Sequence, residues 1–448
     1  MLNIRALHVS WGKMQGVFLH RRVFTQMKKE TVTTNQITEG VIWKQLLLFF
    51  FPIVLGTFFQ QLYNTADTIV VGRFVSKEAL AAVGGSAAQI VGLIVGFFVG
   101  LASGASVIIS QFYGAKNRVQ LNRALHTAYA FSIIGSIFIT VLGILIAPWM
   151  LELMHTPQET MADALLYLRI YFAGIIFVFI YNVGSSILRA MGDSRRPLYY
   201  LIVCCFLNIV LDIVLVIVFH MGVAGVSIAT IFSQGVSAVL ITRALMHSDD
   251  LYQLEFRKIR FHKSALISLI WVGCPTGIQS VLYSVTNMLI QTFLNNLGTD
   301  TVAAWSAFGK IDSLYWMVNN AFGIAVTTFV GQNFGAGKYD RMKKSVRIGL
   351  CMGLCTALTL TLIFYNFGTP LFRLFTSDEN VVSIGMQMLH HVAPAYCLFV
   401  FIELLSGALR GTGDVVIPML ITCFGVCLLR IAWLFFIVDR KSTRLNSS

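Results

Sequence analysis

The chain contains 448 residues, of which 56% are hydrophobic and only 12% are charged, and its formal net charge is +13. A soluble protein of this length could not cover its surface with so few charged side chains, so this composition excludes a soluble globular protein. All eight cysteines lie inside apolar runs, where we expect small buried side chains rather than disulfides or a metal site.

Apolar runs long enough to cross a bilayer as helices recur along the whole chain. We predict eleven spans, over residues 46–71, 79–112, 124–149, 164–188, 197–219, 222–245, 264–297, 301–334, 346–370, 383–409 and 415–438. These runs are continuous, whereas the strands of a membrane β-barrel alternate between apolar and polar residues. The sequence therefore predicts an all-α polytopic membrane protein.

Lysine and arginine are distributed unevenly between the loops. If the N-terminus is cytoplasmic, the internal loops carry 17 of these residues and the external loops carry only Arg73, Lys77 and Arg373. This asymmetry predicts a multi-pass protein of the plasma membrane with a cytoplasmic N-terminus. Because membrane orientation explains the basic residues, we expect no nucleic-acid partner.

Two short motifs occur once in each half of the chain. Residues 110–115 (SQFYGA) resemble residues 331–336 (GQNFGA), and residues 188–193 (LRAMGD) resemble residues 409–414 (LRGTGD). Both pairs are separated by 221 positions, and a proline follows each LRxxGD motif at the same offset. This repeat predicts two six-helix bundles related by a pseudo-two-fold axis along the membrane normal, with substrate sites near the midplane.

The repeat sets the predicted domain boundaries. We expect a cytoplasmic leader over 1–45, an N-terminal lobe over 46–246, a cytoplasmic linker over 247–263 and a C-terminal lobe over 264–438, with five of six helices. Residues 1–26 have no evident role and suggest an upstream start codon; a short interfacial helix is the alternative. The polar residues 439–448 (DRKSTRLNSS) resemble translated adapter sequence. Our hypothesis is a non-native tail in place of a twelfth helix; a genuine polar tail is the alternative.

Polar side chains inside the first half are the strongest functional candidates, because ionisable groups within a membrane are costly. Gln60, Asn64 and Asp67 form one helical stripe, and Asn208 and Asp212 share one face of another helix. We expect Gln60 and Asn64 to line the substrate cavity. Two carboxylates with nearby amides suit a proton or Na⁺. The alternative is a satisfied polar pair that fixes helix packing.

The second half does not duplicate this carboxylate pair. At the offset of 221, Asn208 corresponds to Leu429 and Asp212 to Trp433. The functional candidates of the second half are instead Glu403 and Arg430. Their side chains face either one another or a central cavity. The alternative to a functional role is a structural ion pair. Lys310 and Asp312 are further candidates, which we expect in an outward vestibule. Four aromatic residues either line a substrate cavity or serve in packing: Tyr283, Trp305, Tyr315 and Trp316.

Over roughly residues 40–438 the chain resembles the multidrug and toxin extrusion (MATE) family of the multidrug, oligosaccharidyl-lipid and polysaccharide exporters. The resemblance rests on residues 60–68 (QQLYNTADT), on residues 331–337 (GQNFGAG) and on the paired LRxxGD motifs. It implies twelve helices in two lobes and export of organic cations or amphipathic compounds, driven by inward H⁺ or Na⁺ through alternating access.

The resemblance also implies which residues bind the coupling ion. The family's N-terminal coupling site matches Asp67, Asn208 and Asp212, together with a tyrosine at Tyr167, for which Tyr171 is the alternative, and a threonine at Thr230. Another branch uses a glutamate in the seventh span, where this chain has Tyr283, so the resemblance does not imply a coupling site in the C-terminal lobe.

The predicted function is therefore a cation-coupled antiporter with no cofactor. We expect a monomer whose partners are the lipid bilayer and a small-molecule substrate. The alternative within transport is a flippase for lipid-linked oligosaccharides. The sequence contains no HExxH, GxSxG or P-loop motif, which argues against a membrane enzyme or an ATP-driven pump.

Overall fold

The computed structural model describes residues 37–248, 252–295 and 298–433, and all regular structure in these ranges is helical. The first half contains α2 (Ile42–Phe74), α3 (Lys77–Gly84), α4 (Ser86–Gly114), α5 (Arg118–Leu153), α6 (Gln158–Ala190), α7 (Arg195–Asp212), the π-helical η2 (Ile213–Val218) and α8 (Gly222–Met246). After the 3-10 helix η3 (Phe256–Lys258), the second half contains α9 (Lys263–Asn295), α10 (Thr299–Gly335), α11 (Tyr339–Arg373), α12 (Glu379–Val392), η4 (Ala393–Ala395), α13 (Tyr396–Thr412), α14 (Val416–Leu420), η5 (Ile421–Leu428) and α15 (Leu429–Trp433).

The predicted fold class is confirmed. In the described part of the chain, nine helical segments are long and apolar enough to cross a membrane, and a tenth apolar segment over 416–432 is shorter. The 37-residue α10 is one more helix, so these described segments together number eleven, and each of the eleven predicted spans corresponds to one of them. The expectations for residues 1–26, for the tail 439–448 and for a missing twelfth helix fall outside the described residues.

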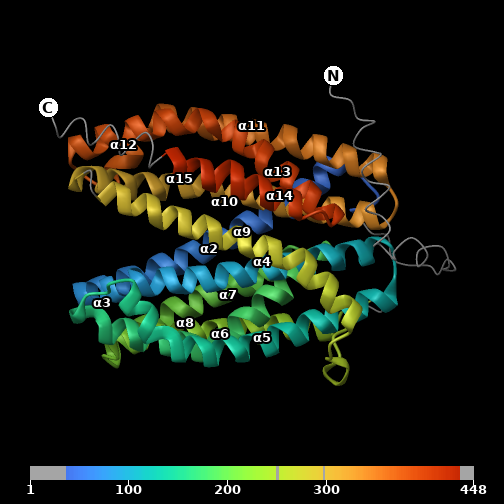
Figure 1. Cartoon of the computed structure of the whole chain (residues 1–448), viewed down its shortest axis with the longest axis horizontal. Helices are drawn as coiled ribbons and strands as arrows, with labels where there is room; N and C mark the ends of the chain where they lie inside the picture. The colour runs from blue at the N-terminus through green and yellow to red at the C-terminus, as the bar shows by residue number, and fades with distance from the viewer. Residues whose placement is uncertain (1–36, 249–251, 296–297, 434–448) are drawn as a thin grey trace.

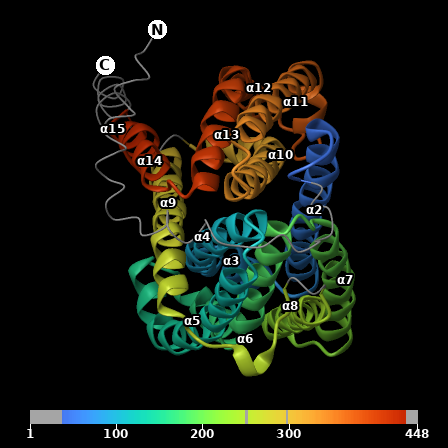
Figure 2. The same ribbon diagram turned by 90° about the vertical axis from the view of Figure 1, so that its right-hand side faces the viewer.

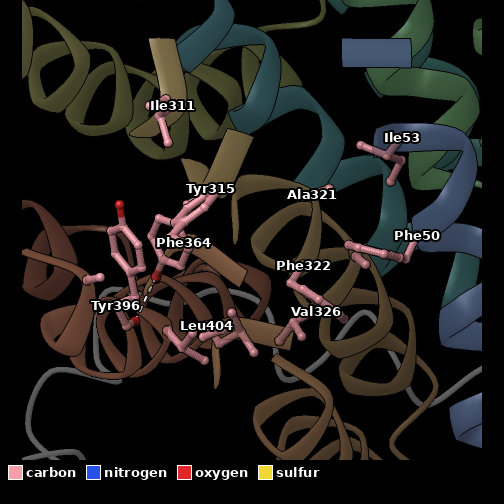
Figure 3. Packing of buried hydrophobic residues seen from close by; sticks show 14 of the residues in the cluster. Phe50, Ile53, Ile311, Tyr315, Ala321, Phe322, Val326, Phe364, Tyr396 and Leu404 are labelled. Atoms are coloured by element: carbon pink, nitrogen blue, oxygen red, sulfur yellow. Dashed lines mark hydrogen bonds between the residues drawn. The ribbon is translucent and has the colours of Figure 1, made fainter. Parts of the chain in front are cut away.

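The helices form two layers that correspond to the two halves of the sequence (Figure 1). The N-terminal lobe contains α3 to α8, and the C-terminal lobe contains α10 to α13. Each lobe has its own apolar core. In the C-terminal lobe, Tyr315 and Tyr396 stack with ring centroids 3.9 Å apart, and Phe364 packs edge-on against Tyr396 (Figure 3).

The first helix of each half contacts both lobes (Figure 2). At one end of α2, Phe50 stacks on Phe322 of α10 with ring centroids 4.0 Å apart, and it belongs to the C-terminal core. At the other end, Tyr63 belongs to an N-terminal core. In the second half, α9 packs along α4 of the N-terminal lobe, while Gln279 in α9 donates a 2.8 Å hydrogen bond to Thr422 of η5. A movement of α2 or α9 would therefore change contacts in both lobes.

Glycines allow α9 to approach α4 closely. A Cβ atom added to Gly100 would lie 2.5 Å from the backbone of Gly277, and one added to Gly104 would clash with the backbone of Gly273. In each helix the two glycines are four residues apart, so they lie on one face and form a GxxxG contact of the kind found between membrane helices.

The repeated LRxxGD motif ends one helix and starts the next. Gly192 and Gly413 have φ angles of +94° and +93°, the left-handed conformation that glycine adopts without steric cost. The next residue donates its N–H back to the helix in both halves, Asp193 to Leu188 at 2.9 Å and Asp414 to the carbonyl of residue 409 at 3.1 Å. The sequence repeat is thus a repeat of backbone geometry.

Candidate functional site

Four side chains from three helices of the N-terminal half meet in one buried cluster, which we call the N-lobe site: Asp67 of α2, Asn208 and Asp212 of α7, and Thr230 of α8. The hydroxyl of Thr230 has two acceptors for its one proton, Oδ2 of Asp67 at 3.1 Å and the backbone carbonyl of Val226 at 3.0 Å. Asn208 and Asp212 lie beside the same carboxylate of Asp67. Both α7 residues are fully buried. Asp212 is the last residue of α7, where the π-helical η2 begins, and such turns are frequent at functional sites.

Several polar atoms of the N-lobe site are buried without a hydrogen-bond partner among the described residues. They are Oδ1 of Asp67, both carboxylate oxygens of Asp212 and both amide atoms of Asn208. Burial of such groups is costly unless something pairs with them. A proton or a small hard cation would supply that partner, since Na⁺ resembles Ca²⁺ and Mg²⁺ in preferring oxygen ligands. The residues therefore fit either a proton or Na⁺.

Two tyrosines of α6 also lie at the N-lobe site. Tyr167 lies near both Asp67 and Asp212, and Tyr171 lies near Asp67. Their rings stack with centroids 6.0 Å apart. The family resemblance assigns the coupling-site tyrosine to Tyr167, with Tyr171 as the alternative. Both lie near Asp67, because they are four residues apart on one helical face.

Sequence reasoning missed three residues next to the N-lobe site. The hydroxyl of Tyr63, one helical turn before Asp67, accepts a 3.2 Å hydrogen bond from Nε2 of Gln234. The hydroxyl of Ser233 and Oε1 of Gln234 are buried without a partner in the described part of the chain. Ser233 and Gln234 lie three and four residues after Thr230, and this helical spacing was the available signal.

The predicted stripe on α2 is only partly buried. Asp67 is half-buried, but Gln60 and Asn64 are exposed. The backbone carbonyl of Asn64 accepts a 2.8 Å hydrogen bond from the hydroxyl of Thr68. The structure therefore brings Asp67 into the N-lobe site and leaves Gln60 and Asn64 exposed.

In the C-terminal half, the suggested contact between Glu403 and Arg430 does not form. Glu403 instead pairs with Arg410, whose Nη2 lies 2.6 Å from Oε1 of the glutamate. The two residues are seven positions apart, two turns along the same face of α13, so their side chains meet directly. Arg430 donates to Oδ1 of Asn287 at 3.3 Å.

Asp312 of α10 is held by two neutral donors. Its Oδ1 accepts from the hydroxyl of Tyr396 at 2.8 Å, and its Oδ2 accepts from Nε1 of Trp316 at 3.0 Å. Tyr315 donates to the backbone carbonyl of Tyr396 at 2.7 Å, and Lys310 is exposed. The predicted candidates Asp312, Tyr315 and Trp316 thus join the C-terminal core.

The two remaining aromatic candidates are half-buried in the same half. Trp305 packs beside Phe308 with ring centroids 5.6 Å apart and contacts the C-terminal core. Tyr283 of α9 lies near Glu403 and Thr422. Trp305 therefore serves in packing, while Tyr283 lies at the contact between α9 and the rest of the C-terminal half.

The two lobes are joined by hydrogen bonds at the end that carries the basic loops, which we call the basic end. Gln111 of α4 donates to the carbonyl of Gly411 at 2.9 Å, and Gln332 of α10 donates to the carbonyl of Ala190 at 2.7 Å. A Cβ added to Gly114 would clash with the backbone of Gln332, so glycine permits this close contact.

Comparison with known proteins places this chain among membrane exporters. Residues 52–214 and 275–436 each match the family model described as MatE, which confirms two related halves. The chain is 31% identical over 395 residues to the Probable multidrug resistance protein YpnP of Bacillus subtilis, covering 88% of each chain. It is 28% identical over 410 residues to the Probable multidrug resistance protein YoeA of the same organism, covering 90% of this chain and 88% of the relative.

Solved structures share the fold. A transporter of the MOP superfamily from Pyrococcus furiosus, whose binding pocket is described as having reverse polarity, superposes with a TM-score of 0.85 at 23% identity, covering 92% of each chain. A MATE family transporter in an outward-facing conformation superposes with a TM-score of 0.82 at 24% identity, covering 88% of each chain.

Proposed function

The chain belongs to the MATE family, and from this premise we propose that it exports small organic compounds, cationic or amphipathic, in exchange for H⁺ or Na⁺. The names of the relatives in Bacillus subtilis, which describe multidrug resistance, support this substrate class and do not favour a lipid-linked oligosaccharide flippase. We place the protein in the plasma membrane with the basic end in the cytoplasm, as the distribution of Lys and Arg predicts.

The N-lobe site is the observation that supports cation coupling. Asp67 and Asp212 together present three carboxylate oxygens with no partner among the described residues. Binding of a proton or Na⁺ would offset the charge of this pair, and its release would restore repulsion between the two carboxylates. Asp67 is on α2 and Asp212 on α7, so this repulsion acts directly on the packing of α2 against α7.

The position of α2 allows ion binding in the N-terminal lobe to change contacts with the C-terminal lobe. The helix carries Asp67 in the N-terminal lobe and Phe50 in the C-terminal core, so a change at one end alters contacts at the other. The hydrogen bonds of Gln111 and Gln332 close the basic end, which supports an outward-facing arrangement of this structure. Alternating access would require these contacts to break in the inward-facing state.

The decisive experiment measures efflux of a cationic dye from proteoliposomes that contain the purified protein. Asp67→Asn and Asp212→Asn should each abolish gradient-driven efflux while the protein remains folded, as judged by size-exclusion chromatography. Asp300→Asn, the same change at an exposed position of α10, should leave efflux unchanged. Full efflux in both site variants would refute the coupling role. Separate collapse of the H⁺ and Na⁺ gradients identifies the ion.

A further inference from the structure

A polar cavity lies at the basic end, between the start of α5 and the linker that connects the two halves. Its volume is about 240 Å³. All of its lining residues are polar: Asn122, Arg123, His126, Gln253, Glu255, Lys258, Arg260 and His262. None of them belongs to the N-lobe site or to the contacts between the lobes.

The linker is fixed onto α5 by direct hydrogen bonds. Nε2 of His126 accepts from the backbone N–H of Glu255 at 3.1 Å, while its Nδ1 lies 2.7 Å from the carbonyl of Asn122 and donates to it. The backbone N–H of His262 donates to the hydroxyl of Thr127 at 3.2 Å. The cavity is therefore a built site with walls held in place, rather than a gap beneath a loose loop.

The cavity has an excess of positive charge. Lys258 is paired with Glu255 at 2.5 Å, but Arg123 and Arg260 form no ion pair with any described residue. Arg260 donates only to Nε2 of His262, at a long 3.4 Å. Burial lowers the pKa of His262, and the charges of Arg260 and Arg123 lower it further. Arg123 of α5 and Arg260 of the linker both line this space, and both residues are exposed.

Two arginines around a small polar cavity match the chemistry of a phosphate group. A planar guanidinium donates two parallel hydrogen bonds to phosphate oxygens, and such charge-assisted bonds are stronger than neutral ones. Basic pockets at the cytoplasmic surface of membrane proteins are suited to anionic lipid headgroups, because the cytoplasmic leaflet is negatively charged. A soluble phosphorylated compound would present the same group from the water side.

We propose that this cavity binds a phosphate group, carried by an anionic phospholipid or by a soluble compound, through Arg123 and Arg260. The bound group bridges α5 of the N-terminal lobe and the linker just before α9, and so fastens the connection between the halves. Neither the family match nor the N-lobe site requires such a ligand.

Two probes separate the two sources in the purified full chain. Phosphatidylglycerol retention is measured by native mass spectrometry against phosphatidylethanolamine, and inorganic phosphate is titrated by thermal shift at constant ionic strength. Retention of phosphatidylglycerol alone assigns a lipid headgroup, and stabilisation by inorganic phosphate assigns a soluble ligand as well. Binding of neither probe to the wild-type protein overturns the proposal.

The arginine pair is tested with a charge-matched control. Arg123→Gln/Arg260→Gln should weaken binding about tenfold or more, because charge-assisted hydrogen bonds are lost. Arg243→Gln/Arg257→Gln removes the same charge from two exposed arginines outside the cavity and should leave binding unchanged. Equal weakening in both double variants would show a diffuse charge effect and overturn the site. If the first variant does not fold, Arg260→Gln alone, at an exposed linker position, provides the comparison.

Discussion

Gln111 and Gln332 occupy equivalent positions in the two halves, and each donates its side-chain amide to a backbone carbonyl of the opposite lobe. The acceptors are equivalent too, because Gly411 follows Ala190 by the same 221 positions that separate the glutamines. The first repeated motif of each half therefore contacts the second repeated motif of the other half. This reciprocal arrangement closes the basic end with a two-fold symmetric pair of hydrogen bonds.

Removing both amides should loosen the basic end. In Gln111→Met/Gln332→Met each lost hydrogen bond contributes about 1 kcal/mol, so the closed arrangement should lose about 2 kcal/mol, or roughly thirtyfold in population. Hydrogen–deuterium exchange should become faster in the turns after α4 and α10. Gln158→Met, at an exposed position of α6, is the control. Unchanged exchange in the double variant would show that these bonds do not hold the lobes together.

The glycine contact between α4 and α9 gives a second prediction. Gly100→Ala places a methyl group 2.5 Å from the backbone of Gly277, so the helices must separate. Overpacking of this kind costs about 1–3 kcal/mol, and the melting temperature of the detergent-purified protein should fall. Gly92→Ala makes the same change on α4 where no atom lies within 4 Å, and stability should hold or rise. Equal effects of both substitutions would contradict a specific contact.

Much of the fold could be predicted because a helix that crosses a bilayer needs a long continuous run of apolar residues, and such runs are evident in the sequence. The continuous apolar runs predicted the helices, and the offset of 221 predicted two halves. The reciprocal contact of Gln111 and Gln332 could not be predicted, since a repeat shows equivalence and does not show which copies touch. The crossing of α4 and α9 does have a signal in the sequence, because Gly100 and Gly104 are four residues apart, as are Gly273 and Gly277.

The candidate site was predicted unevenly for a similar reason. Spacing places Asp212 and Asn208 on one face, and the structure buries both. The same spacing cannot tell how wide the buried face of α2 is, so it could not show that Asn64 is exposed while Asp67 is half-buried. The partner of Glu403 was missed because Arg410 was assigned to a loop, whereas α13 continues through it to Thr412.

Thr230 offers a test of the N-lobe site that spares both carboxylates. Thr230→Val removes the hydroxyl that donates to Asp67 while keeping the shape of the side chain. A hydrogen bond to a charged group contributes about 1.5–3 kcal/mol, so the apparent affinity for the coupling ion should change at least about tenfold. The measurement is the dependence of dye efflux on ion concentration in proteoliposomes. Thr230→Ser keeps the donor and should behave as wild type; a defect shared by both variants would indicate altered packing instead.

The pair of Glu403 and Arg410 separates a structural role from a role in transport. Its side chains are only 23% and 12% exposed, so Glu403→Gln leaves a buried arginine without its counter-charge. This should cost about 3 kcal/mol of unfolding free energy, and Glu403→Gln/Arg410→Gln should recover part of the loss.

The exposed pair of Arg373 and Glu379, with side chains 57% and 69% exposed, is the control for this comparison. The same cycle of single and double variants there should give a coupling energy of about 0–1 kcal/mol, because water screens both charges. Unfolding in denaturant and efflux per folded molecule are measured on the same preparations. A structural pair predicts lower stability with normal efflux in Glu403→Gln. Normal stability with lost efflux would instead assign Glu403 to the transport cycle. In that case efflux would require the negative charge of Glu403, whereas folding would not require its ion pair with Arg410.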